Sequence, residues 1–130
     1  MVKQMAGLPT LIFVGSGYDR HNTTISPVER DDIRHRILTE AADVFGGVTI
    51  LDANGAWVDD SGRLIEEKIF QIIIYSHRTE GEEHASKWAG FIRFILTTSR
   101  QTSVLVDDRA YPEAYLVFFD SFKAYGVEHA

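Results

Sequence analysis

Two short segments that are apolar at almost every position set the strongest limit on the fold. The first is LIFV, residues 11–14, which ends at Gly-Ser-Gly, and the second is IFQIIIY, residues 69–75, interrupted by Gln71. Side chains along a strand alternate between the two faces of a sheet, so such a segment is apolar on both faces. We therefore predict that both segments are central strands.

A helix is predicted to begin at Pro27, directly after the loop that follows the first strand. Ser26 and Glu29 have the spacing of a capping box, and Pro27 suits the first helical position. Apolar residues then recur at helical spacing, and Gly46 and Gly47 supply a left-handed stop. The apolar stripe consists of Ile33, Ile37, Ala41, Val44 and Phe45.

A second helix is predicted after the long strand of residues 64–77. Acidic residues at 80, 82 and 83 suit the positive end of its dipole. Phe91 and Phe94 lie beside the core stripe and widen it beyond what one sheet face needs. The stripe itself consists of Ala85, Trp88, Ala89, Ile92, Ile95 and Leu96.

Three further strands complete the pattern, over residues 48–58, 102–107 and 115–119. We expect a bulge or bend at Asn54-Gly55 and the chain reversal at residues 59–62. The order is β-α-β-β-α-β with an extra C-terminal strand. This is the split β-α-β or ferredoxin-like arrangement, an α+β fold with both helices on one face of an antiparallel sheet.

Length, charge and the lack of cysteine exclude several classes of protein. The 130 residues fit one domain, residues 1–130, and the net charge of −6 argues against binding long nucleic acid. The absence of cysteine excludes disulfides, thiolate catalysis, zinc ribbons and iron–sulfur clusters. The sequence has no secretory signal pattern and no membrane-spanning apolar run, so we predict a cytoplasmic protein with no membrane partner and no cofactor.

The hairpin that follows the first helix carries Trp57 between two acidic pairs, Asp59-Asp60 and Glu66-Glu67. Trp57 would be an interface contact, a lid on its own hairpin, or a platform on which a ligand ring stacks. The glutamates point to opposite faces of a strand, so they would not easily share a proton. They are either solvated or a catalytic carboxylate pair.

The loop after the first strand combines small residues with aromatic and basic residues. Gly15-Ser16-Gly17 is followed by Tyr18, Arg20 and His21, which predicts either an anion-facing loop or an ordinary connection. It matches neither the dinucleotide-binding nor the P-loop pattern, because Arg20 replaces the third glycine and no Gly-Lys-Ser/Thr ending is present.

Further candidate ligand-binding residues lie where two other strands end. His77 and Arg78 follow the long strand, and Arg109 follows the fourth; Arg109 would either hold a phosphate or carboxylate or pair with a neighbouring aspartate. His77, Glu80 and His84 could meet around a metal, but they match no metal-binding signature, so no metal site is predicted.

Aromatic residues are more numerous near the C-terminus than an exposed edge strand in a monomer needs. We therefore predict that the protein is a homo-oligomer, because large apolar patches on soluble proteins mark partner surfaces. These residues are Tyr111, Tyr115, Phe118, Phe119, Phe122 and Tyr125.

The hairpin also carries the motif G-V-T-I-x-x-A-x-G-x-W-x-x-x-x-G-x-L-I-x-E, residues 47–67. In this motif the chain resembles a family of small uncharacterised bacterial and phage domains, and the resemblance extends over about residues 10–106. It implies a ferredoxin-like fold and carries over no catalytic residue. Many members of that family begin with a lipoprotein-type signal, which this sequence lacks.

Three functional hypotheses follow. The first is a non-enzymatic, oligomeric binder of a small anionic aromatic ligand, for example a phage protein that sequesters a nucleotide-derived signal. Its ligand-binding residues would come from Tyr18, Arg20, His21, Trp57, His77, Arg78 and Arg109. The second is a small dimeric enzyme with His77 or His21 as general base beside Glu67. The third is a structural or protein-interaction module.

Overall fold

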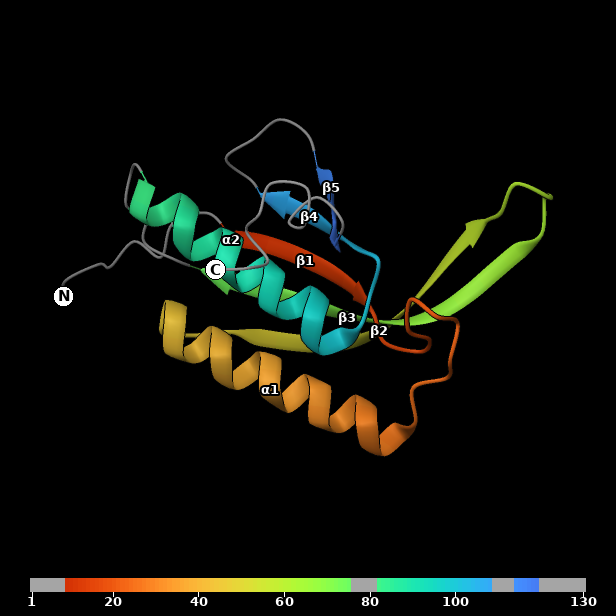
Figure 1. The fold of residues 1–130 in the computed structure, drawn as a ribbon, viewed down its shortest axis with the longest axis horizontal. Coiled ribbons are helices and arrows are strands. Elements are labelled where there is room, and N and C mark those ends of the chain that lie inside the picture. The colour runs from red at the N-terminus through yellow and green to blue at the C-terminus, as the bar shows by residue number, and fades with distance from the viewer. Residues whose placement is uncertain (1–8, 76–81, 109–113, 120–130) are drawn as a thin grey trace, which may run out of the picture.

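The structure is a two-layer arrangement of a five-stranded sheet and two helices (Figure 1). The computed structural model describes residues 9–75, 82–108 and 114–119. In chain order the elements are β1 (Pro9–Gly15), α1 (Pro27–Phe45), β2 (Thr49–Val58), β3 (Leu64–Tyr75), α2 (Glu82–Ser99), β4 (Ser103–Asp108) and β5 (Tyr115–Phe118).

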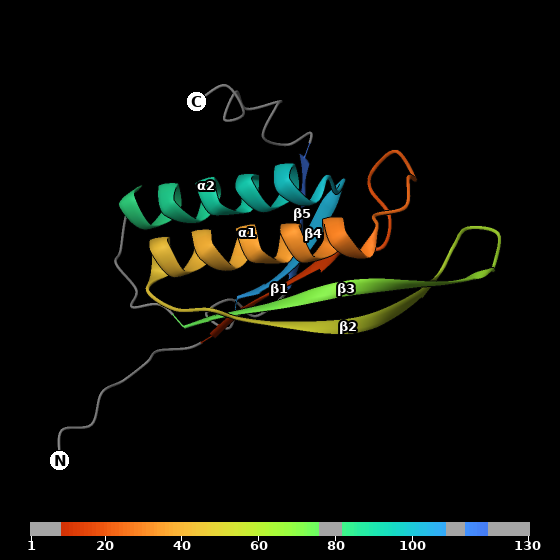
Figure 2. The ribbon, with the colours of Figure 1, turned by 90° about the horizontal axis from the view of Figure 1, so that it is seen from below.

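The strands lie in the order β2-β3-β1-β4-β5, and every neighbouring pair is antiparallel. Both helices lie side by side on the same face of the sheet (Figure 2). The predicted α+β class, the helices on one face and the central positions of β1 and β3 are therefore confirmed. The extra strand β5 pairs with β4, which makes β4 a third interior strand.

The core lies between the helices and one face of the sheet. Ile12 of β1 stands opposite Ile72 of β3 and Val106 of β4, and all three side chains are buried. From the helices, the core includes Ile33, Ile37, Ala41, Phe91, Ile92, Ile95 and Leu96. Removing these apolar side chains from water is the main favourable contribution to folding.

Helix α1 begins and ends as its sequence predicts. The Ser26 hydroxyl accepts a hydrogen bond from the backbone N–H of Glu29 at 3.2 Å, and the Glu29 carboxylate accepts one from the Ser26 N–H at 3.4 Å. Gly46 ends the helix with φ 87°, in the left-handed region. Its N–H donates to the carbonyl of Ala42, which satisfies one of the free carbonyls at the helix end.

Of the bulge or bend predicted at Asn54-Gly55, the bulge was wrong. The β2–β3 register runs without interruption through this point, with Asn54 opposite Lys68 and Gly55 opposite Glu67. A tight Asn-Gly turn needs positive φ at both residues, and here the long partner strand keeps both extended. The reversal occurs at the predicted position, where the N–H of Asp59 donates to the carbonyl of Arg63 and Gly62 has φ 83°.

Two expectations for α2 were also wrong. Phe91 is buried in the helix layer, with its ring centroid 5.2 Å from that of Phe45, and is not a surplus aromatic residue. The Trp88 ring lies 4.3 Å from the same Phe45 ring, so three aromatic side chains join the two helices. Ala85 is exposed, because the core contacts of α2 begin at Trp88.

Within the described residues, no helix has the length and apolar character needed to cross a membrane.

The capping box gives a first test of this structure. We expect Ser26→Ala to lower the free energy of unfolding by about 1 kcal/mol, since it leaves an N-terminal amide of α1 without its acceptor. Urea denaturation would measure the change. Val28→Ala on the same turn, at an exposed side chain, is the control and should change the value by less than about 0.5 kcal/mol. Equal losses in both variants would contradict the capping role.

Candidate functional site

A pocket of about 440 Å³ lies where the loop after β1, the start of α1 and the far part of the β2–β3 hairpin meet. Its volume lies in the range of small-molecule sites in proteins. We call it the glutamate pocket. It is lined by Gly17, Tyr18, Thr24, Ile25, Pro27, Arg30, Asn54, Glu66, Glu67 and Lys68.

The two glutamates of the pocket lie on opposite faces of β3. Glu66 and Lys68 alternate in step with the buried Phe70, so their side chains point to the side of the helices. Glu67 points to the other side, where its Oε2 lies 3.6 Å from the position that a Cβ at Gly15 would take. The prediction that the pair does not share one proton agrees with this arrangement.

The pocket is lined by two carboxylates, Glu66 and Glu67, and by two cationic side chains, Arg30 and Lys68. In the part of the chain that the structure describes, neither Glu66 nor Glu67 has an ion-pair partner. Burial raises the pKa of the half-buried Glu67 carboxyl above its usual value of 4.5. A carboxylate that is partly removed from water without a cation beside it favours a positively charged ligand or a proton.

Arg30 supplies a fixed positive charge on the opposite wall. Its guanidinium donates to Asp52 Oδ1 at 2.6 Å and to the Ser16 hydroxyl at 3.3 Å, and it lies over the Phe70 ring at 5.3 Å. The Arg30 side chain is only 19% exposed. Three contacts in different directions hold it in one orientation, so it is ready to meet a ligand carboxylate without reordering.

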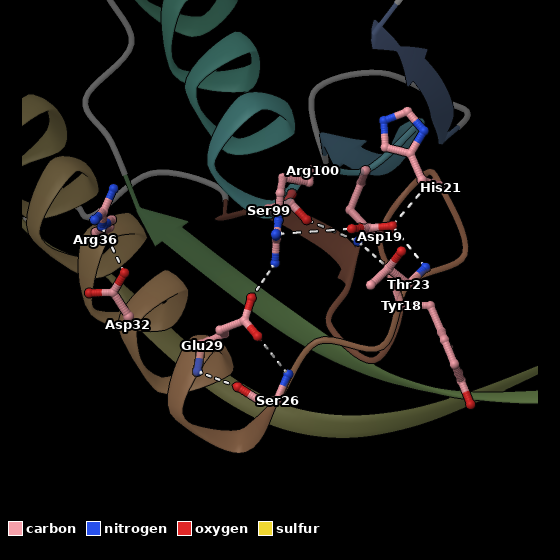
Figure 3. Close-up of polar contacts among 11 residues, drawn as sticks. Tyr18, Asp19, His21, Thr23, Ser26, Glu29, Asp32, Arg36, Ser99 and Arg100 are labelled. Carbon is pink, nitrogen blue, oxygen red and sulfur yellow. Dashed lines mark hydrogen bonds and ion pairs between the residues drawn. The ribbon is translucent and has the colours of Figure 1, made fainter.

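The loop of residues 16–25, which we call the Tyr18 loop, forms a third wall. Its centre is the Asp19 carboxylate, which accepts hydrogen bonds from the backbone N–H groups of His21 at 2.9 Å and Thr23 at 3.0 Å (Figure 3). The hydrogen bond from Thr23, together with that from His21, lowers the pKa of Asp19. Tyr18 is half-exposed, and its side chain points away from the Asp19 carboxylate.

The other predicted ligand-binding residues are spread over the molecule. Of the loop residues, Tyr18 lines the glutamate pocket, whereas the Arg20 guanidinium lies over the Phe119 ring at 4.4 Å. Trp57 is half-exposed near the end of the β2–β3 hairpin. His77, Arg78 and Arg109 lie outside the described residues, as does the combination of His77, Glu80 and His84 side chains.

Three residues of the pocket, Arg30, Lys68 and Asn54, were not predicted from the sequence. Arg30 lies one turn beyond Ser26, the capping residue of α1, and its guanidinium reaches Ser16 after β1 and Asp52 in β2. A basic residue at that spacing after a capping box is the signal that could have identified it. Across residues 9–75, 82–108 and 114–119, no group of three His, Asp or Glu side chains is placed to hold a metal ion.

Comparison with known proteins finds likeness in fold. No protein-family model matches the chain, and no curated protein matches it. A phage SAM lyase in complex with S-methyl-5'-thioadenosine superimposes with a TM-score of 0.56 at 23% identity, over 91% of this chain and 95% of that chain. A phage SAM lyase in the apo state gives 0.55 at 24% identity, over 91% and 94%. CutA from Synechococcus elongatus gives 0.43 at 12% identity, over 89% and 80%.

The burial of Glu67 predicts a pH dependence of stability. Its raised pKa means that the folded protein holds this proton to higher pH than the unfolded chain, so the free energy of unfolding falls as pH rises through the interval above 4.5. We expect Glu67→Gln to raise the melting temperature at pH 7 by about 1–3 °C and to have a smaller effect at pH 4.

Thermal unfolding of the ligand-free protein at both pH values would measure this effect. The matched control is Glu66→Gln, at the exposed neighbouring carboxylate. A Glu67→Gln variant that is less stable than the wild type at pH 7 would show that the ionised carboxylate is favoured in the fold.

Proposed function

We propose that the glutamate pocket binds an S-adenosylmethionine-type nucleoside and that the protein acts on it as a SAM lyase. The observation that carries this proposal is a pocket in which the half-buried Glu67 carboxylate, without an ion pair to any described residue, lies near the half-exposed ring of Tyr18. A fold likeness to a phage SAM lyase over 91% of the chain supports it. This proposal keeps the small aromatic ligand of the first sequence hypothesis. It replaces the anionic ligand expected there with one that carries positive charge.

The chemical groups of such a ligand match the walls of the pocket. S-adenosylmethionine carries a sulfonium and an ammonium, and this positive end would lie against the half-buried carboxylate of Glu67. Its carboxylate would meet Arg30 or Lys68, and its adenine would stack on Tyr18. Lys68 forms no ion pair with any described residue, so it is available for this contact.

A lyase that leaves S-methyl-5'-thioadenosine breaks the bond between the sulfonium sulfur and the carbon chain of the amino acid. The bonding electron pair stays on sulfur, which becomes a neutral thioether. As this bond breaks, either a base removes a proton from the neighbouring carbon, which leaves a carbon–carbon double bond, or the carboxylate of the chain attacks the carbon that sulfur leaves and closes a lactone. Glu67, with its raised pKa, would accept the proton in the first case and only position the positive ligand in the second.

The test is to incubate the purified protein with S-adenosylmethionine and to identify the products by chromatography and mass spectrometry. We expect S-methyl-5'-thioadenosine to form and kcat/KM to fall at least about tenfold in Glu67→Gln, because a charge contact in a partly desolvated site is lost. Glu40→Gln, on α1 outside the glutamate pocket, is the matched control. The fate of the carbon chain distinguishes the two roles of Glu67.

Binding without reaction would favour the first sequence hypothesis, a protein that sequesters its ligand. In that case calorimetry would detect the ligand, and the ligand would be recovered intact after denaturation. If the wild-type protein neither binds nor converts S-adenosylmethionine or S-methyl-5'-thioadenosine, the proposal is wrong.

We also propose that the chain is a ferredoxin-like domain with an added fifth strand and that it forms homo-oligomers through the open sheet face. One row of directly opposed side chains crosses all five strands on this face: Leu51, Gln71, Phe13, Leu105 and Leu116. Four of the five are apolar, and Leu51, Leu105 and Leu116 are between 37% and 55% exposed. A second copy offers a matching apolar surface by symmetry.

Leu116→Glu tests the open face as an interface. We expect light scattering to show a smaller particle than for the wild type, because a charge on β5 would have to be buried between copies. Val28→Glu, on the exposed side of α1, should leave the mass unchanged. A wild-type protein that is monomeric at high concentration would contradict the prediction.

A further inference from the structure

Helix α2 ends with an arginine where glycine is the usual residue. Arg100 has φ 56°, in the left-handed region. Its N–H bonds to the carbonyl of Thr97 at 3.3 Å and the N–H of Gln101 bonds to that of Leu96 at 3.2 Å, which is the Schellman pattern of helix ends. A side chain in this backbone conformation costs about 1–2 kcal/mol relative to glycine. A residue keeps a strained backbone conformation of this kind when contacts with the surrounding structure stabilise it.

The contacts of the Arg100 side chain join three separate segments. Its guanidinium donates to Glu29 Oε2 at 2.7 Å and lies 4.0 Å from Asp19 Oδ2, so it bridges the first turn of α1 and the centre of the Tyr18 loop (Figure 3). The Asp19 side chain is only 7% exposed, whereas the Arg100 side chain is 40% exposed. The hydrogen bond from Arg100 is also the largest cause of the lowered pKa of Glu29.

Backbone and amide contacts add to this bridge. The carbonyl of Arg100 accepts from the N–H of Arg20 at 2.7 Å, and Gln101 Nε2 donates to the carbonyl of Tyr18 at 2.7 Å. The Gln101 Oε1 lies 2.5 Å from the position that a Cβ at Gly15 would take. Glycine at the end of β1 therefore leaves the space in which the Gln101 amide reaches Tyr18.

We infer that Arg100 and Gln101 are positioning residues that hold the Tyr18 loop against the glutamate pocket, so that the Tyr18 wall is formed before a ligand arrives. Both residues contact the loop, and neither lines the pocket. The role of the wall in binding a nucleoside rests on the proposed function, whereas the attachment of the loop to α2 does not.

Arg100→Gly separates this role from a general contribution to stability. The variant removes the guanidinium and relieves the left-handed strain at the same time. We expect the urea midpoint to stay equal to or above that of the wild type, while hydrogen exchange of the His21 and Thr23 amides rises about tenfold. Arg100→Lys keeps the charge and should restore part of the protection.

Gly15→Ala and Gln101→Ala test the second contact. The added Cβ at residue 15 would displace the end of the Gln101 side chain, so both variants should increase exchange at Asp19 and Arg20 to a similar extent. Gly47→Ala is the matched control, since a Cβ there meets nothing within 4 Å.

Ligand measurements complete the experiment. We expect KM for S-adenosylmethionine, or the Kd of S-methyl-5'-thioadenosine, to rise about fivefold or more in Arg100→Gly, with a smaller change in kcat. Unchanged exchange in the loop would overturn the inference, and so would increased exchange spread evenly over the protein. If the wild-type protein binds neither nucleoside, the proposed function fails, while the exchange measurements still decide whether α2 holds the loop.

Discussion

The antiparallel pairing of β1 with β3 under the two helices is the constraint on which the other features depend. Its register places Ile12 opposite Ile72 and Val14 opposite Phe70, all buried. A slip of one residue would turn each of these side chains to the open face, so the core fixes the register. The N–H of Ser16 continues the ladder by donating to the carbonyl of Lys68 at 2.8 Å. The core thus also fixes where the Tyr18 loop leaves the sheet, beside the glutamates.

The position of the pocket follows from the unequal lengths of the strands. β1 ends at Gly15, opposite Ile69, whereas β3 extends back to Leu64 with only β2 as its partner. Glu66 and Glu67 lie in this extension, beyond the part of β3 that pairs with both β1 and β2. Carboxylates in the core itself would be strongly desolvated, and at the tip of the hairpin they would be fully hydrated. At the boundary Glu67 is half-buried, which gives it a raised pKa while leaving its neighbour exposed.

Local signals in the sequence predicted the elements well, and contacts between distant residues limited the prediction of the site. The capping box of α1 and the apolar pattern of β1 each lie within a few residues, and both are as expected. Arg30 and Asp52 are 22 residues apart, and Arg100 and Glu29 are 71 apart. A local pattern can single out one member of such a pair, such as Arg30 after the capping box, but not its distant partner. The bulge predicted at Asn54-Gly55 was wrong for the same reason, because pairing with the distant β3 continues through both residues.

Arg100 occupies a left-handed position at the end of α2 where glycine is preferred, and this departure points to a role for its side chain. The helix-end pattern favours glycine, and a surface ion pair contributes little by itself, since exposed pairs are typically worth about 0–1 kcal/mol. The pair with Glu29 is partly exposed on both sides and does not offset the strain alone. The contacts with the largely buried Asp19 and the two hydrogen bonds to the Tyr18 loop act together with it. The Asp19 contact of the Arg100 side chain, the backbone carbonyl of Arg100 and the Gln101 amide all meet the same loop, so Arg100 and Gln101 order it together.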